Sequence, residues 1–326
     1  MRRYTFAAVA VLLVLFPWRQ APTGNSVAYT IENLATSASI DNLVPAETGI
    51  NASGQISGTV TNTLNQTRAV RYTDGIGWEY VPGLTWGSTA AGINVHGDIV
   101  GTQLVAGLKH AYRYNAGTNL VDDIRPLSGG SASAGLAIND SGEVAGQSDA
   151  GNNVLLGFRA SPGVPAVQLP TLGGNLGNAC GINSSGQVAE TSTTASGYSH
   201  AARVEADGVT VVDLGTFDGP TGMSVACAID DLGHVGGFSS ANVGTLFRAF
   251  RFDTDHLVAV DGVLPSFFSN VESIAKAMSA GWYISTVDFN QYAMLHTDAN
   301  GAVDLNTQIP PNSGWVLTEI KGINAS

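Results

Sequence analysis

One short pattern recurs along the chain at nearly constant spacing, and it limits the possible folds more than any other feature of the sequence. It reads small-Ile-Asn-x-x-Gly-x-Ile/Val-x-Gly, and we call its Asn or Asp the anchor. The anchors are Asn51, Asn94, Asn139, Asn183, Asp230 and Asn324. Their spacings are 43, 45, 44, 47 and 94 residues, and the last is twice 47. A repeat of this length indicates an array of equal units, so we predict a degenerate copy near residue 277, with Met278 at the anchor and Gly281 at the turn.

Each unit is predicted to hold four short strands. Asn-x-x-Gly is typical of a tight turn, because Asn bonds its own backbone and Gly adopts conformations that other residues avoid. The turn joins the first two strands, and the Ile before each anchor is expected to be buried (Ile50, Ile93, Ile138, Ile182, Ile229 and Ile323). A third strand follows, at RAVRY from Arg68, HAYRY from His110, LGFRA from Leu156, HAARV from His200, RAFRF from Arg248 and YAMLH from Tyr292. A fourth comes after it, as in NLVDDI from Asn119.

Four strands in about 45 residues are typical of a propeller blade, so we predict an all-β propeller. Composition agrees: the chain holds 40 Gly and only 12% charged residues, whereas helical surfaces are rich in Glu, Lys and Arg. The positions of the ends predict six complete units and a partial seventh shared by the two termini. An open β-solenoid is the alternative.

The first residues have the form of a secretion signal. Met1-Arg2-Arg3 precedes an apolar run from Tyr4 to Pro17, which is too short to span a membrane, and a small-x-small site ends at Ala28. We therefore predict a signal peptide over 1–28, with an uncleaved membrane anchor as the alternative. One repeat domain is predicted over 29–326, secreted or cell-surface associated, with the periplasm as the alternative location. No second long apolar run follows, so no membrane span is expected in the mature chain.

The charge of the chain excludes one class of partner. The net charge is −12, and it becomes −15 without residues 1–28, which hold three Arg and no acid. Because phosphate backbones attract basic surfaces, nucleic acid is not an expected partner. The sequence does not indicate an oligomeric state.

The repeat resembles the HAF-repeat extracellular family of bacteria. The resemblance rests on the GIN-x-x-G-x-V-x-G strand, on the His-Ala-Phe strand (His110-Ala111-Tyr112, His200-Ala201-Ala202 and Arg248-Ala249-Phe250) and on Leu172-Gly173-Gly174. It covers nearly the whole mature chain, and it implies a secreted or surface-attached repeat protein of undefined function. Family members usually continue past the last GIN, so we expect the native chain to be longer at its C-terminus by some 20 to 40 residues, roughly half to most of one repeat.

Five arginines occupy one repeat position, which makes them candidate ligand-binding residues (Arg71, Arg113, Arg159, Arg203 and Arg251). A ring of guanidinium groups would suit an anionic ligand such as an acidic polysaccharide. The favoured interpretation is structural: each Arg pairs with a carboxylate on the next strand, such as Asp123, Asp213 or Asp304, because a repeat copies whatever it contains.

The most divergent stretch, Pro265 to Asn290, supplies a second set of candidates. It holds the adjacent aromatics Phe267-Phe268 and Trp282-Tyr283. Phe267 and Trp282 are the residues that we single out as able to stack on sugar rings. The alternative, which we favour, is that they are core residues of a degenerate blade.

The remaining reactive residues predict no catalytic centre. In an oxidising compartment, two cysteines suggest a disulfide. Cys180 and Cys227 occupy the same position in adjacent units, however, where the expected sheet separation exceeds the reach of a disulfide. We therefore favour two buried free thiols, with a disulfide as the alternative. The six histidines form no zinc-binding pair, and the sequence has no nucleophile elbow, phosphate loop or dinucleotide fingerprint. We expect no cofactor, no metal and no catalytic residue.

The sequence thus predicts a secreted, non-enzymatic binding or surface-structural module, with a polysaccharide or another surface protein as partner. The regularity of the loops supports this, because function on a repeat scaffold usually appears as local departures. The alternative is a polysaccharide-processing enzyme on the same scaffold. It would require a concave site with clustered unpaired carboxylates, or a His that breaks the repeat.

Overall fold

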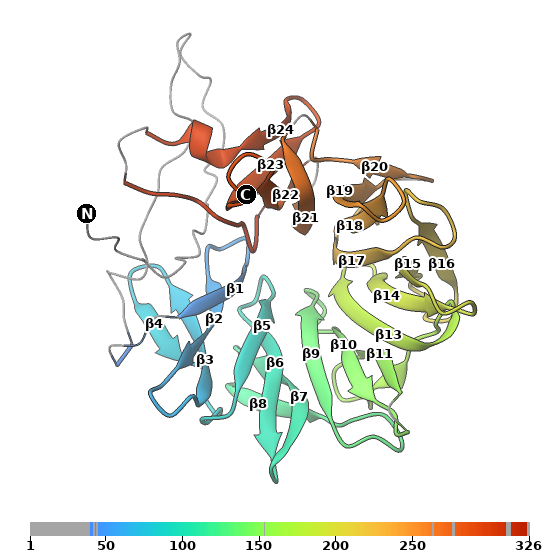
Figure 1. Ribbon diagram of the computed structural model, residues 1–326. Coiled ribbons are helices and arrows are strands. Elements are labelled where there is room, and N and C mark those ends of the chain that lie inside the picture. Colours follow the sequence, from blue (N-terminus) through green and yellow to red (C-terminus); the bar gives the residue numbers. More distant parts are fainter. Residues whose placement is uncertain are drawn as a thin grey trace.

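The protein is a six-bladed β-propeller whose C-terminal segment lies between the last blade and the first (Figure 1). The computed structural model describes residues 40–324 except 42, 44, 153, 254, 263, 276, 277 and 311–313. The predicted signal peptide and the expected C-terminal extension lie outside these residues. Among the described residues, no helix is long and apolar enough to cross a membrane.

Every blade is a four-stranded antiparallel meander. Blades 1 to 3 consist of β1 Ala46–Ile50, β2 Ile56–Thr61, β3 Thr67–Thr73, β4 Gly77–Tyr80, β5 Thr89–Ile93, β6 Ile99–Val105, β7 Leu108–Asn115, β8 Leu120–Ile124, β9 Ser133–Ile138, β10 Val144–Asp149, β11 Leu155–Ala160 and β12 Val167–Gln168. Blades 4 to 6 consist of β13 Gly173–Ile182, β14 Val188–Thr194, β15 Ser199–Val204, β16 Val211–Gly215, β17 Ser224–Ile229, β18 Val235–Ala241, β19 Leu246–Phe252, β20 Leu257–Ala259, β21 Ser266–Ala275, β22 Met278–Ser285, β23 Gln291–Thr297 and β24 Gly301–Asp304. A short 3₁₀ helix, η1 Leu305–Gln308, follows β24.

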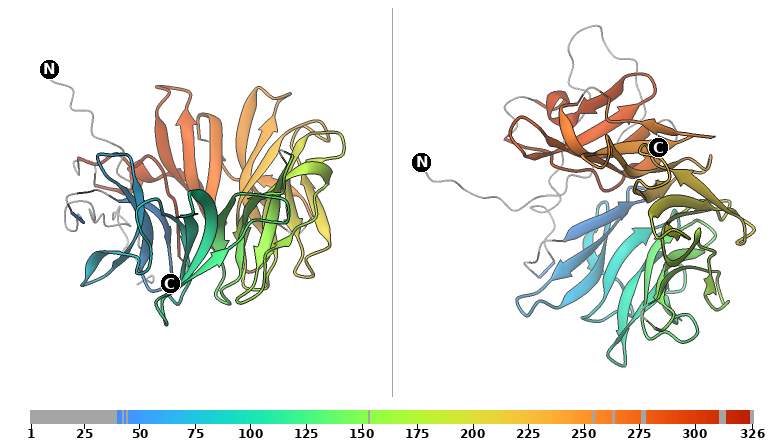
Figure 2. Two further views of the ribbon diagram at one scale, coloured as in Figure 1. Left: turned by 90° about the horizontal axis from the view of Figure 1, so that it is seen from below. Right: turned by 45° about the vertical axis from the view of Figure 1, so that its right-hand side comes forward.

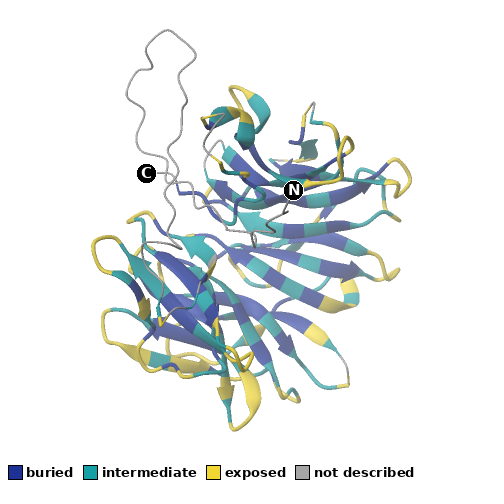
Figure 3. Cartoon of the chain, turned by 60° about the vertical axis from the view of Figure 1, so that its left-hand side comes forward, coloured by how far each residue is buried: buried dark blue, intermediate teal, exposed yellow. Residues whose placement is uncertain are grey.

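The turns gather at the two ends of the blades, as the side view in Figure 2 shows. The end that carries the predicted Asn-x-x-Gly turns, between the first and second strands, is called the anchor face. The opposite end, with the turns between the second and third strands, is called the hairpin face. Strand interiors are buried while turns are exposed (Figure 3). Hydrophobic clusters bridge neighbouring blades, as where Val100 and Ala111 pack with Val144 and Phe158.

A glycine recurs on the second strand because the first strand bulges opposite it. A β-carbon at Gly101 would lie 1.9 Å from the carbonyl oxygen of Thr89, and one at Gly237 would lie 1.9 Å from that of Val225. The register of the first strand shifts at these places. The high glycine content is therefore partly a requirement for close strand contact.

The predicted turn of the sixth unit is wrong. Met278 begins β22, and Gly281 is a strand glycine that pairs with Val271. A β-carbon at Gly281 would lie 2.0 Å from the carbonyl oxygen of Asn270. The anchor position is held by Ala275, which pairs with Met278. Blade 6 has lost both Asn and Gly from a turn that is one residue shorter, so the spacing alone placed the copy about three residues too late.

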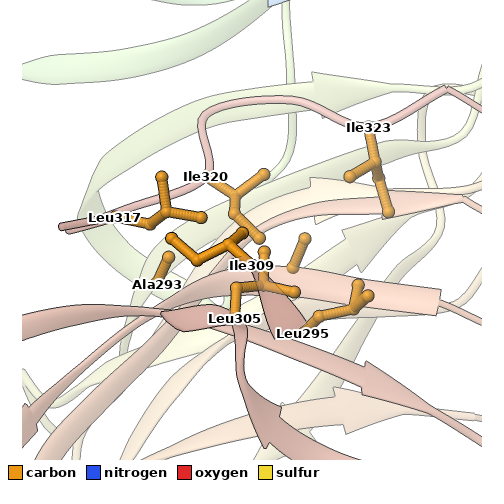
Figure 4. Packing of buried hydrophobic residues seen from close by; sticks show 8 residues of the cluster. Ala293, Leu295, Leu305, Ile309, Leu317, Ile320 and Ile323 are labelled. Atoms are coloured by element: carbon orange, nitrogen blue, oxygen red, sulfur yellow. The ribbon is translucent and has the colours of Figure 1, made fainter. Parts of the chain in front are cut away.

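The C-terminal segment takes the seventh position and closes the ring. Leu317, Ile320 and Ile323 pack with the core of blade 6 (Figure 4). The N–H of Ala293 donates to the carbonyl of Leu317 at 2.9 Å, and Asn324 Nδ2 donates to the carbonyl of Asn51 at 3.1 Å. The last GIN copy therefore lies against the first, and a solenoid open at both ends is excluded.

The propeller, its four-stranded blades and the partial seventh unit are confirmed. The predicted burial of the Ile before each anchor holds only in part. Ile182 and Ile323 are buried, whereas Ile50, Ile93, Ile138 and Ile229 are half-buried. Three of the six, Ile138, Ile182 and Ile229, line a cavity on the anchor face.

Candidate functional site

The anchor side chains form a ring of hydrogen bonds that links successive blades. Within a turn, Asn94 Oδ1 accepts the N–H groups of His96 at 3.0 Å and Asp98 at 2.9 Å. Between blades, each anchor Nδ2 donates to the backbone carbonyl of the next anchor, at 2.8, 3.1, 3.0 and 3.0 Å along the series from Asn51 to Asp230. The sequence predicted the local turn but not the bond to the neighbouring blade.

The ring of anchor bonds is interrupted at blades 5 and 6. Asp230 has no side-chain donor, and its oxygens accept the N–H groups of Leu232 and His234 while pairing with His234 Nδ1 at 2.9 Å. The next anchor position holds Ala275, which has no polar side chain. Asp230 and His234 are the departure from the repeat that the enzyme alternative required.

A cavity of about 480 Å³ lies on the anchor face beside this interruption. It is lined by the Ile residues of blades 3 to 6, and Asp140 and Asp231 also line it. Asp140 Oδ1 accepts the N–H of Val95 at 3.0 Å, and Asp231 Oδ1 accepts the N–H of Ser184 at 2.9 Å. These two exposed carboxylates therefore tie adjacent turns together.

The five arginines belong to the scaffold. Arg71, Arg113, Arg159 and Arg203 donate through Nη1 to the carbonyl of the turn glycine in the next blade, at 3.2, 2.8, 2.7 and 2.8 Å. Arg251 instead pairs with Asp253 at 2.6 Å and Asp298 at 2.8 Å. Arg113 also pairs with Asp122 on the next strand, β8, as the structural interpretation expects. The three carboxylates named as examples have other partners: Asp123 and Asp213 pair with His110 and His200, and Asp304 accepts from Tyr283.

The hairpin face exposes a large apolar side chain on every blade. The exposed residues are Leu64, Leu104, Leu108, Leu155, Tyr198, Val243, Val287 and Phe289. Two of them adopt left-handed backbone conformations: Val243, which is 91% exposed, has φ 57°, and Phe289, which is 73% exposed, has φ 60°. A β-branched or bulky residue is a true outlier there, because its Cβ crowds the backbone.

A hollow of about 470 Å³ lies beside Val243, between blades 4 and 5. Tyr198, Met223 and Phe247 supply its apolar lining. Asp218, which also lines it, accepts the N–H groups of Val243 at 2.9 Å and Gly244 at 2.8 Å. Burial alone would raise the pKa of Asp218, but the hydrogen bonds from Val243 and Gly244 outweigh this effect and lower the pKa below its usual value. The carboxylate therefore holds the turn that presents Val243.

The two predicted aromatic candidates lie in different surroundings. Phe267 packs against the exposed Phe289, with ring centroids 6.0 Å apart. Trp282 is half-buried, donates through Nε1 to Glu272 at 2.9 Å and packs on Phe268 at 5.0 Å. The structure thus places Phe267 beside an exposed ring on the hairpin face, whereas Trp282 joins an aromatic cluster that runs through Phe268 and Phe238 to Phe247.

The sequence reasoning missed one buried acid, Glu190 on β14. Its side chain is fully buried, and neither carboxyl oxygen has a hydrogen-bond partner among the described residues. The sequence does mark this residue as unusual, because Glu190 occupies the repeat position that holds a strand glycine in the other five blades (Gly58, Gly101, Gly146, Gly237 and Gly281). Being closed off from solvent, it cannot reach a substrate.

Both cysteines are free thiols, as predicted, but they are part-buried rather than fully buried. Burial raises the pKa of Cys227 to about 12 and that of Cys180 well above its usual value, so neither thiol is a ready nucleophile. The described residues contain no group of three His, Cys, Asp or Glu side chains placed to hold a metal ion.

Comparison with known proteins identifies a fold and no family. No protein-family model matches the sequence, and no curated protein matches it. Among solved structures, TolB from Acinetobacter baumannii is 12% identical, with a TM-score of 0.51 over 82% of this chain and 67% of that one. An acylaminoacyl peptidase from Pyrococcus horikoshii is 7% identical, with a TM-score of 0.55 over 80% of this chain and 46% of that one.

The chain thus spans about half the length of that peptidase. A second acylaminoacyl peptidase structure, in complex with Z-Gly-Gly-Phe-chloromethyl ketone, is similar to the same degree, with 7% identity, a TM-score of 0.53 and coverage of 83% of this chain and 47% of that one. At such identities the likeness concerns the propeller fold, which hosts unrelated functions.

Proposed function

We propose that this propeller is a secreted, non-enzymatic binding or surface-structural module of the HAF-repeat type, and that its hairpin face is the contact surface. The agreement of five GIN-like copies in register supports the family assignment, and the N-terminal signal pattern supports an extracellular or periplasmic location. The proposed partner is a polysaccharide or another surface protein.

One observation carries the assignment of the hairpin face. Val243 and Phe289 stand at turn positions where φ is positive and where Gly would be free of strain. Holding a non-glycine residue there costs about 1–2 kcal/mol. Both side chains are exposed, so the cost is not offset by packing in the core. Strain that serves to expose an apolar side chain is characteristic of a contact residue.

The non-enzymatic part of the proposal follows from how the described carboxylates are used. On the hairpin face, Asp218 holds two backbone N–H groups, and the hydroxyl of Tyr292 and the amide of Asn290 lower the pKa of Asp288 to about 2. An acid held ionised in this way is a poor proton donor near neutral pH.

The alternative, a polysaccharide-processing enzyme, would act at the anchor-face cavity. Asp230 and His234 depart from the repeat there, and Asp140 and Asp231 line the same cavity. All three carboxylates already hold backbone donors, which favours a structural role. Asp140→Asn and Asp231→Asn variants should leave any ligand binding unchanged, and release of reducing ends from a polysaccharide panel that disappears in these variants would establish the enzyme.

The binding proposal is tested on a carbohydrate array with the labelled protein. We expect Phe267→Ala and Phe289→Gly to lower binding at least tenfold, which corresponds to the loss of about 1.4 kcal/mol, and Trp282→Ala to change it less. Val209→Gly is the matched control, because Val209 is 74% exposed on the anchor face. Unchanged binding in both hairpin-face variants would remove this face from the proposal.

A further inference from the structure

Four of the five seams between consecutive blades 1 to 6 share one hydrogen bond, and the seam between blades 3 and 4 lacks it. In the four, a backbone N–H on the third strand of one blade donates to a serine hydroxyl at the start of the next blade. The pairs are Ala69 to Ser88, Ala111 to Ser133, Ala201 to Ser224 and Ala249 to Ser269, at 3.2, 2.9, 2.8 and 2.8 Å. Between blades 3 and 4 the same two positions are Gly157 and Gly177.

Glu190 fills the space that those two side chains leave. A β-carbon at Gly177 would lie 2.1 Å from Glu190 Oε1, and one at Gly157 would lie 2.9 Å from it. Three departures from the repeat therefore coincide at one seam: Gly to Glu at 190, Ala to Gly at 157 and Ser to Gly at 177. Because both glycines make room for the one carboxyl group, the three departures depend on one another structurally.

Among the described residues, no Lys, Arg or His pairs with the Glu190 carboxyl. Gln147 on β10 and Gly157 on β11 carry no charge, and Cys180 on β13 is an uncharged thiol. The buried His200 on β15 lies one cross-strand pair away on the same face of the blade, but its Nδ1 pairs with Asp213 at 2.9 Å. Both carboxyl oxygens lack a partner among the described residues, and the side chain is 0% exposed. An unpaired buried carboxylate is strongly unfavourable, so the group remains protonated or the seam admits water.

We infer that the seam between blades 3 and 4 is a pH-sensitive joint, closed while the Glu190 carboxyl keeps its proton and loosened when the proton is lost. Burial raises the pKa of Glu190 to about 8 from its ordinary 4.5. The closed seam therefore binds a proton that the opened seam releases throughout this interval. The equilibrium constant for opening rises up to tenfold for each pH unit between about 4.5 and 8, and it becomes constant above pH 8.

Hydrogen exchange on the full chain tests the inference, with protection factors corrected for the intrinsic pH dependence. In the wild type, the protection of Leu155–Ala160 should fall up to tenfold per unit from pH 5.5 to 8 and then become constant. The equivalent seams at Ala111 and Ala201 are internal controls, and their protection should not follow this course.

Two variants isolate the carboxyl group. Glu190→Gln keeps the size and removes the titration, and the triple variant Glu190→Gly, Gly157→Ala, Gly177→Ser restores the repeat with its serine bond. Protection at Leu155–Ala160 should be independent of pH in both, and the triple variant keeps the test decisive if Glu190→Gln folds poorly. A wild-type seam without pH dependence, or a pH dependence that persists in either variant, would overturn the inference.

Discussion

A single nitrogen atom at the anchor decides whether a turn is only local or also joins two blades. Asn62 shows the difference, because its turn on the hairpin face repeats the anchor geometry: Oδ1 accepts the N–H groups of Leu64 and Gln66, and Nδ2 donates to Gln66 Oε1 at 3.0 Å. Asn183 makes the same local bonds and in addition donates to the carbonyl of Asp230 at 3.0 Å. Comparing Asn62 with Asn183 therefore distinguishes the contribution of the turn from that of the hydrogen bond between blades.

We therefore predict that Asn183→Asp lowers the free energy of unfolding by about 1–3 kcal/mol, because it removes the buried bond to the Asp230 carbonyl, which keeps only the N–H of Gly233, and buries a carboxylate oxygen in place of that donor. The turn itself is retained, since Asp accepts the same backbone N–H groups. Asn62→Asp is the control, and it should change stability by less than about 0.5 kcal/mol. Urea unfolding at pH 7 measures both, and equal effects of the two substitutions would show that the inter-blade bond contributes nothing.

At the scale of the turn, the conformation of Val243 predicts a substitution that stabilises. Val243→Gly removes the crowding at φ 57° and should raise the free energy of unfolding by about 1 kcal/mol. Val209 does not have a positive φ. Val209→Gly should therefore lower the free energy of unfolding by about 0.5–1 kcal/mol, because the unfolded chain gains conformational freedom. The contact-surface proposal adds a second expectation, that Val243→Gly weakens ligand binding while it stabilises the protein.

Thermal unfolding followed by circular dichroism measures the sign of each change. A lower melting temperature for Val243→Gly would mean that the Val243 side chain stabilises the isolated propeller. The strain argument for the hairpin face would then fail.

The elements differ in how much of them the sequence could predict. The motif Ile-Asn/Asp-x-x-Gly predicted the first two strands and the turn between them in five blades, because periodicity and turn chemistry are local properties. Blade 6 lost that chemistry, so spacing alone misplaced Met278. The arginine partners were invisible because a backbone carbonyl leaves no trace in the sequence, and the strain at Phe289 is a property of φ. Glu190 could have been found, because it breaks an otherwise regular column of glycines.

At the scale of the whole molecule, the C-terminal segment closes the seam between blade 6 and blade 1. Ile320 is 1% exposed in the core of blade 6, and its N–H donates to the carbonyl of Gly281 at 3.3 Å. Lys321 Nζ lies 3.6 Å from Glu272 Oε2, and the N–H of Ile323 donates to Ser273 Oγ at 3.2 Å. Asn324 completes the ring by donating to Asn51. Among the described residues, the C-terminal segment thus links the last blade to the first.

Ile320→Ala should therefore cost about 2–5 kcal/mol, as for other buried large-to-small substitutions, and it should open the ring at a defined place. We expect hydrogen exchange to rise at Ala46–Ile50 and Met278–Ser285 before it rises at Val144–Asp149, on the far side of the ring. Leu169→Ala is the matched control, because Leu169 is 2% exposed in the core that joins blades 3 and 4. It should raise exchange locally in those blades and leave Ala46–Ile50 protected. Because each blade contacts only its neighbours, damage spreads from the nearest seam. Equal exchange in all blades for both variants would mean that the propeller unfolds as one unit and that the closing segment has no special role.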